Sequence, residues 1–188
     1  MAKGVKIALA GEGGQGVQSV AMILTEAAYA MGKEALYIPN FGVEQRGGVS
    51  VAFVQIDDEK IGSPKFKTAD IVVALSDRAV RRTTMYCDQE TLFFYDDNIE
   101  DVEEDLPKNS KKVVALPAIK VAKEELHPRV FNVVVMGAVI GATGVVTEEK
   151  AKEALESKLG YKFEQNPELR EMNFKALQRG MEIVKEVM

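Results

Sequence analysis

The chain has 188 residues, and its 24 Lys and Arg residues against 29 Asp and Glu give a net charge of -5. A hydrophobic content of 46% is ordinary for a globular protein, and this length allows one domain with its own core. No stretch gathers Lys and Arg into a basic stripe, which argues against nucleic acid as a partner. The single cysteine, Cys87, excludes an internal disulfide and an iron–sulfur cluster held by this chain alone, and favours a reducing cytoplasm.

The most apolar segment, residues 133–146, is too short to span a membrane and is interrupted by Gly137, Gly141 and Gly144. It predicts a buried helix whose glycines allow close packing, with a partner subunit as one candidate neighbour. At the start of the chain, the apolar run after Lys3 ends at once in glycines, unlike the pattern of a signal peptide. We therefore expect a protein that is neither exported nor anchored in a membrane.

The first two thirds of the chain predict strands that alternate with helices and loops. An apolar run, a glycine cluster and then apolar residues three and four apart predict a strand, a loop and a helix that ends near Gly32. Pro39 is expected to end the second strand, and Ser76 with Asp77 to cap a short helix. The acidic stretch 96–105 predicts a solvated loop or surface helix. The predicted strands are residues 5–10, 34–38, 49–56, 71–75, 91–95 and 112–116, with a short edge segment at 61–64.

Helical patterns dominate the rest of the chain. Pro117 begins a predicted helix that runs to about residue 126. After Pro128, helices are predicted over 131–144, 147–159 and from 167 to the end, with a short link over 160–166. This order of elements predicts a single α/β domain over residues 1–188. Its architecture is expected to be three-layer α/β/α, with a mostly parallel, Rossmann-like sheet and a helical C-terminal region.

The segment Gly11-Glu12-Gly13-Gly14-Gln15-Gly16 fits the pattern GxGxxG between a strand and a helix. Glycines let a backbone approach a phosphate closely, and a helix N-terminus offers free N–H groups. The acidic residue that contacts the ribose in NAD sites is missing, because the second strand ends in Ile38-Pro39-Asn40. An ordinary NAD site is thus disfavoured. A tight structural turn and a site for a phosphate or acyl-carrier group both stay open.

A second loop, residues 40–48, places Glu44 and Arg46 among glycines between two hydrophobic strands. Loops of this composition commonly bind a ligand or partner. Arg46 has the fork geometry to hold a carboxylate or phosphate, and Gly47 with Gly48 allows a close backbone approach. An internal ion pair between Glu44 and Arg46 explains the same pattern equally well.

Five motifs occur in a fixed order along the chain: GEGGQG at 11–16, NFGVEQRGG at 40–48, IGSP at 61–64, ADIVVAL at 69–75 and FNVVVMGAVIGATG at 131–144. In this order the chain resembles the gamma subunit of 2-oxoacid:ferredoxin oxidoreductases. A similar domain occurs within single-chain pyruvate:ferredoxin oxidoreductases. The resemblance runs over essentially the whole chain.

The resemblance implies a subunit of a complex that oxidatively decarboxylates a 2-oxoacid to acyl-CoA and CO2 and passes the electrons to ferredoxin. It implies thiamine diphosphate, Mg and iron–sulfur clusters on partner subunits (alpha, beta and delta), with CoA as a substrate and no cofactor bound by this chain alone. The chain would cover the active site and help CoA access and assembly, without a catalytic residue or metal ligand. The binding positions implied are Gly11, Gly13, Gly14, Gln15 and Gly16 in the first loop, and Glu44, Arg46, Gly47 and Gly48 in the second. The alternative is a nucleotide-binding Rossmann-like protein that acts alone.

Three other positions favour structural interpretations. His127 precedes Pro128 at the expected end of a helix, where an imidazole caps carbonyl groups more often than it catalyses. Cys87 lies beside Met85 and Tyr86 and is expected to be a packed thiol. Ser76 follows a strand end, where open α/β sheets bind ligands, but a helix cap is the favoured role.

Overall fold

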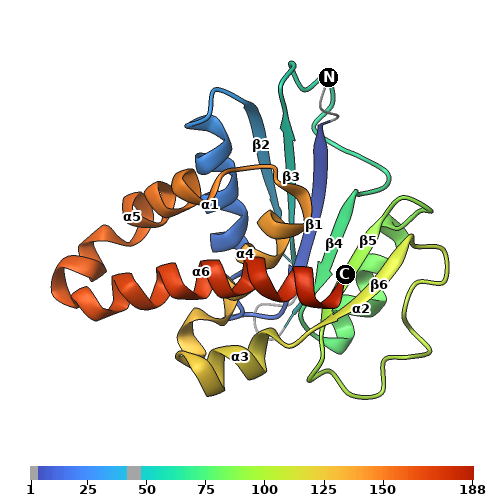
Figure 1. Ribbon diagram of the computed structural model, residues 1–188. Helices are drawn as coiled ribbons and strands as arrows, with labels where there is room; N and C mark the ends of the chain where they lie inside the picture. Colours follow the sequence, from blue (N-terminus) through green and yellow to red (C-terminus); the bar gives the residue numbers. More distant parts are fainter. Residues whose placement is uncertain (1–3, 42–47) are drawn as a thin grey trace.

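The computed structural model describes residues 4–41 and 48–188. In this part of the chain, six strands form one sheet in the order β2-β3-β1-β4-β5-β6 (Figure 1). The strands are β1 (Val5–Gly11), β2 (Glu34–Asn40), β3 (Ser50–Asp57), β4 (Ile71–Ala74), β5 (Leu92–Asp96) and β6 (Lys112–Leu116).

One strand of the sheet runs against the others. β1, β4, β5 and β6 pair in parallel, whereas β3 lies antiparallel to both β1 and β2. The prediction of a mostly parallel sheet is therefore confirmed, with β3 as the exception. Pro39 does not end β2 as predicted but lies inside it, opposite Ala52. β2 is an edge strand, where a residue without an N–H group is tolerated.

The helices are α1 (Val17–Tyr29), α2 (Asp77–Thr83), α3 (Ala118–Glu125), α4 (Phe131–Thr143), α5 (Glu148–Gln165) and α6 (Pro167–Val187), with short 3-10 turns η1 (Thr84–Tyr86) and η2 (Pro128–Val130). Two predictions were wrong. The segment 61–64 is irregular instead of a short edge strand, and the predicted link 160–166 is helical as far as Gln165. α5 ends at Gln165 because Pro167 disfavours helical backbone in the residue before it, Asn166, which is extended here.

The two faces of the sheet are covered unequally. Ile7, Leu9 and Phe94 point into the larger core, which α1, α4, α5 and α6 complete. Ala8 and Phe93 point to the opposite face, which the short helix α2 covers together with irregular segments. The three-layer arrangement is thus confirmed, and its thin third layer leaves the helical C-terminal region on one side (Figure 1).

The glycines of the apolar helix serve packing within the chain. α4 lies against α6, and a Cβ on Gly137 would overlap the backbone oxygen of Leu177. A Cβ on Gly180 of α6 would in turn overlap the backbone oxygen of Val134. The close neighbour predicted for α4 is therefore α6, rather than a partner subunit at these positions.

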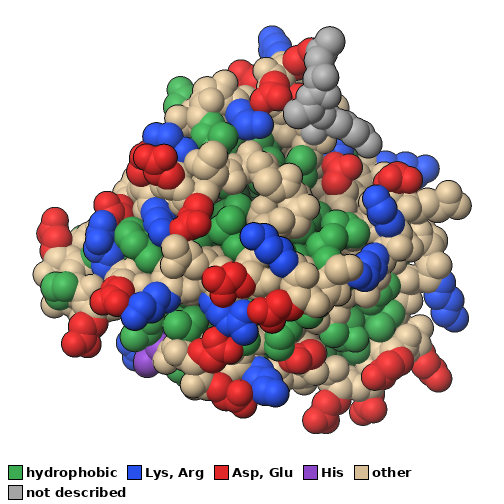
Figure 2. All heavy atoms as spheres, viewed as in Figure 1, with side chains coloured by type: hydrophobic (Ala, Val, Ile, Leu, Met, Phe, Trp, Pro, Cys, Tyr) green, Lys and Arg blue, Asp and Glu red, His purple; other side chains and the backbone are tan. Residues whose placement is uncertain are grey.

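The surface carries mixed charges. Figure 2 shows Lys and Arg side chains interspersed with Asp and Glu over the face that contains α6. In the described ranges, which leave out 1–3 and 42–47, no helix combines the length and apolar character that a membrane crossing needs.

Candidate functional site

The two glycine-containing loops predicted to bind a ligand begin at the same end of the sheet. Gly11, at the end of β1, is paired with Ser50 at the start of β3, and Asn40, at the end of β2, is paired with Val51. The glycine loop therefore adjoins the start of β3, where the second loop ends, and the end of β2 lies one strand further along the sheet. Gly48 is described and half-buried. The predicted residues Glu44, Arg46 and Gly47 lie outside the described residues, so the choice between anion contact and an internal ion pair stays a prediction.

Within the first loop, the Gln15 side chain forms its hydrogen bonds with backbone groups of this chain. Its Oε1 accepts a hydrogen bond of 2.6 Å from the Glu12 N–H, and its Nε2 donates one of 2.7 Å to the backbone oxygen of Leu75 after β4. A Cβ on Gly11 would lie 2.7 Å from this same Oε1. Gly11 and Gln15 thus anchor the loop to the sheet, a role that fits the structural-turn alternative at these two positions.

The middle of the loop has a different environment. Gly13 and Gly14 are exposed, and a Cβ on either would meet no atom within 4 Å. Gly14 has a φ of 92°, which favours glycine. Their backbone is open to solvent beside the start of α1, where the helix dipole is positive and the N-cap residue supplies no side-chain bond. Gly13 and Gly14 are the loop positions a phosphate group can approach.

Gly16 joins the loop to the C-terminal helices. It has a φ of 77°, and a Cβ there would lie 2.6 Å from Nδ2 of Asn132, near the start of α4. A larger residue would therefore be strained and would displace the Asn132 side chain. Gly16 brings the beginnings of α1 and α4 together.

A hydrogen-bond network that the sequence did not reveal fixes the second loop's ends. The Tyr37 hydroxyl donates to Oε1 of Gln18 over 2.6 Å, and Nε2 of Gln18 donates to Oγ of Ser50 over 2.7 Å. Burial raises the pKa of the Tyr37 phenol, which keeps the hydroxyl protonated as a donor. The network connects β2, α1 and β3 near the strand ends that adjoin the two loops. Only the polarity of Gln18 on an otherwise apolar helix face could have signalled it.

The α2 side of this end of the sheet is aromatic. An apolar hollow of about 340 Å³ lies between the end of β2 and the segment after β3, with Pro39, Phe53 and Phe66 among its lining residues. The rings of Phe53 and Phe66 meet edge to face with centroids 5.5 Å apart, and Tyr86 packs on Phe53 in the same manner at 5.2 Å. The end of β2, where the second loop begins, is therefore flanked by half-buried aromatic side chains.

Asp96 is a buried carboxylate that the sequence placed in a solvated stretch. It ends β5, and its Oδ2 accepts a 2.9 Å bond from the Ile119 N–H in the first turn of α3. Its Oδ1 accepts from the backbone N–H and the side-chain amide of Asn98, at 3.0 and 3.1 Å. Asp96 therefore acts as a helix cap. The rest of the stretch 96–105 is irregular, in agreement with the loop prediction.

The remaining singled-out side chains have structural roles. Ser76 caps α2, because its Oγ accepts from the Ala79 N–H over 3.1 Å. Cys87 is buried, and burial, together with the nearby Asp88 carboxylate, raises the pKa of its thiol to about 12, so it is a poor nucleophile. The role predicted for His127 was wrong, because the imidazole does not cap carbonyl groups at the end of α3. Its Nδ1 accepts a hydrogen bond of 3.1 Å from the Arg129 N–H, so His127 caps the start of η2.

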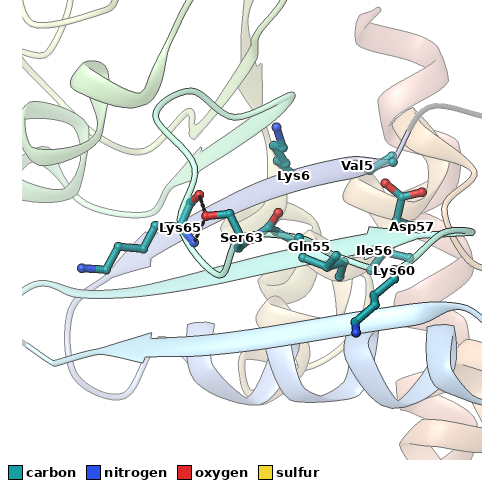
Figure 3. A pocket seen from close by; sticks show the side chains of 11 residues that line it. Val5, Lys6, Gln55, Ile56, Asp57, Lys60, Ser63 and Lys65 are labelled. Atoms are coloured by element: carbon teal, nitrogen blue, oxygen red, sulfur yellow. Dashed lines mark hydrogen bonds between the residues drawn. The ribbon is translucent and has the colours of Figure 1, made fainter.

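Another cavity, of about 220 Å³, lies at the amino end of β1, at the opposite end of the sheet from the two loops (Figure 3). Gln55 shapes it by donating from Nε2 to the backbone oxygen of Ser63 over 2.8 Å. Figure 3 shows the side chains of Lys60 and Lys65 pointing in different directions. These cations do not converge on one point, unlike those of a phosphate site. Across residues 4–41 and 48–188, no three His, Cys, Asp or Glu side chains gather as a metal-binding group.

A family model described as pyruvate ferredoxin/flavodoxin oxidoreductase matches residues 6–183, a range that includes both loops and all six strands apart from Val5, the first residue of β1. The chain belongs to this family. The resemblance noted from the sequence motifs is thereby confirmed at the level of the family.

The relatives come as separate subunits and as parts of longer chains. A gamma subunit of keto/oxoacid ferredoxin oxidoreductase from Geobacter sulfurreducens is 30% identical, with a TM-score of 0.79 and coverage of 97% of this chain and 99% of that one. Ketoisovalerate oxidoreductase subunit VorA of Methanothermobacter marburgensis is 30% identical over 94% of this chain, which spans 36% of that relative. A 2-oxoglutarate:ferredoxin oxidoreductase chain from Magnetococcus marinus, with 2-oxoglutarate, coenzyme A and succinyl-CoA bound, is 26% identical with a TM-score of 0.88, and this chain spans 32% of it.

Proposed function

We propose that this chain is the gamma-type subunit, a single domain over residues 1–188, of a multi-subunit 2-oxoacid:ferredoxin oxidoreductase. The complex would oxidatively decarboxylate a 2-oxoacid to acyl-CoA and CO2 and pass the electrons to ferredoxin in the cytoplasm. The observation that carries the proposal is the near end-to-end match to a gamma subunit, 97% of this chain against 99% of the other. The names of relatives include ketoisovalerate and 2-oxoglutarate enzymes, so the substrate class is a 2-oxoacid.

The redox and thiamine chemistry belongs, in this proposal, to the alpha, beta and delta partners. The only cysteine of the chain is Cys87, and a buried thiol with a raised pKa does not fit a cluster ligand. Thiamine diphosphate and Mg would likewise be held by the partners. The chain itself supplies no catalytic side chain and acts on the reaction through shape and backbone groups.

Two effects define this indirect role. The exposed backbone of Gly13 and Gly14, at the positive end of α1, would face the route by which CoA enters. Arg46 of the second loop would add a guanidinium group able to bind a CoA phosphate. Holding CoA in place keeps its thiol close to the acyl intermediate and correctly oriented, and covering that intermediate excludes water. A relative whose structure contains coenzyme A and succinyl-CoA supports CoA as the ligand.

The experiment is affinity purification of the tagged chain from its native anaerobic source, followed by assay of 2-oxoacid oxidation with and without CoA. The proposal predicts co-purified subunits that carry thiamine diphosphate and iron–sulfur clusters, and CoA-dependent activity. Recovery of the chain alone with a bound nucleotide would instead establish the stand-alone alternative. The absence of an acidic residue at the end of β2, where Asn40 stands, already disfavours an NAD site.

A further inference from the structure

A groove of about 680 Å³ lies on the helical side of the molecule, between α1, η2 and the elbow where α5 meets α6. Figure 1 shows this elbow at one end of the helical layer, away from the strands. Apolar side chains from α1, α5 and α6 line the groove, among them Ile23, Leu159 and Leu169. Arg129, Lys158 and Lys162 supply its charges, and the described residues that line it include no Asp or Glu.

These three cations have no internal counter-charge. Nζ of Lys158 contacts the Met22 sulfur at 3.8 Å, and Nζ of Lys162 lies 5.6 Å from the centroid of the Tyr161 ring. Among the described residues, neither lysine nor the exposed Arg129 side chain forms an ion pair. Five other cations on α5 and α6 pair with glutamates: Lys150 with Glu153, Lys152 with Glu148, Arg170 with Glu156, Lys175 with Glu171 and Arg179 with Glu125.

The arrangement leaves positive potential concentrated in a concave surface. Lys158 and Lys162 are four residues apart on one helix, where like charges repel and lower helix stability. The chain as a whole is acidic, with a net charge of -5, so this local excess runs against its overall balance. Tyr161, between the lysines, is 61% exposed, although tyrosine and arginine are the side chains that anchor protein interfaces.

We propose that this groove docks an acidic segment of another subunit of the complex, with an apolar side chain against the floor and carboxylates beside the three cations. The inference rests on the proposed function, because it requires the chain to work as a subunit. Charge complementarity selects the occupant: a second copy of the same groove would repel, and a small phosphate would leave the apolar floor uncovered. Asn132 lines the groove and touches Gly16, so the docked segment would lie next to the glycine loop.

The test measures assembly of the full chain with the purified remaining subunits of its complex, by titration at several salt concentrations. The double variant Lys158→Glu/Lys162→Glu should bind about tenfold more weakly or worse, because carboxylates would then face carboxylates. Lys158→Gln/Lys162→Gln should show a smaller loss and a weaker salt dependence than the unmodified chain. The matched control is Lys123→Glu/Lys185→Glu, which changes the same charge at exposed lysines on α3 and α6 outside the groove and should assemble normally.

Two further measurements decide between occupants. A photo-crosslinking amino acid in place of Tyr161 should label an Asp- or Glu-containing peptide of another subunit in the assembled complex. Unchanged assembly of the Lys158→Glu/Lys162→Glu variant, given equal thermal stability of all chains, would overturn the inference.

The second measurement is thermal stability with inorganic pyrophosphate. If pyrophosphate stabilises the unmodified chain but not the Lys158→Glu/Lys162→Glu variant, the groove is a small-anion site and the inference is overturned. Failure of the unmodified chain to assemble at all would refute the proposed function instead, and the docking site with it.

Discussion

The contact between α4 and α6 makes a specific prediction for Gly180→Ala. Alanine favours helix over glycine by about 1 kcal/mol, so on propensity alone the change would stabilise the protein. The new Cβ, however, would overlap the backbone oxygen of Val134 and approach the Cα of Gly137 to 2.9 Å. Backbone atoms cannot rotate away, so α4 and α6 must separate, and overpacking of this kind costs about 3 kcal/mol.

The net expectation is a loss of about 2 kcal/mol, or about 4–8 °C in Tm for a domain of this size. Urea unfolding followed by circular dichroism measures it. Gly160→Ala is the matched control, because Gly160 lies within α5 with no atom within 4 Å of its Cβ position, and this change should stabilise by about 0.5–1 kcal/mol. Equal responses of the two variants would refute the packing argument.

The remaining predictions concern the site and the buried thiol. Gln15→Ala should lower the free energy of unfolding by about 1–2 kcal/mol and speed amide hydrogen exchange in the glycine loop, because two hydrogen bonds of the loop are lost. Unchanged exchange would show that the loop keeps its conformation without the Gln15 side chain. Burial raises the pKa of the Cys87 thiol to about 12 in the folded state, so the thiol's contribution to stability is complete below about pH 9 and is lost as pH rises toward about 12. Urea unfolding of Cys87→Ala should therefore show a free energy of unfolding that falls less steeply above pH 9 than that of the unmodified chain. Arg46→Ala should impair acyl-CoA formation by the complex more than it lowers the Tm of the chain, and equal damage to both would favour an internal ion pair.

Local patterns were sufficient for much of the fold. The strand, glycine loop and helix over residues 5–29 could be predicted because apolar runs, glycines and spacing of three and four agree there. The direction of β3 has no such local signature, since the same alternating pattern fits a strand in either orientation. The helical course of residues 160–165 was missed because Gly160 resembles a helix end, whereas α5 ends at Gln165, just before Asn166 and Pro167.

The candidate site could be predicted only where local sequence patterns determine it. The glycines of the first loop mark a tight connection, but whether Gln15 faces a ligand or the sheet depends on Leu75, 60 residues away. The Tyr37, Gln18 and Ser50 network and the buried Asp96 likewise join segments far apart in sequence. The glycine stripe of α4 correctly indicated close packing, but sequence could not say that α6 of the same chain fills it.

The central claim is that this chain completes a 2-oxoacid:ferredoxin oxidoreductase. The most direct measurement is 2-oxoacid oxidation by the purified remaining subunits, with CoA and ferredoxin present, before and after the chain is added back. The account predicts low CoA-dependent activity without the chain and recovery when stoichiometric chain is supplied. Full activity in its absence, with no binding of the chain to those subunits, would contradict it.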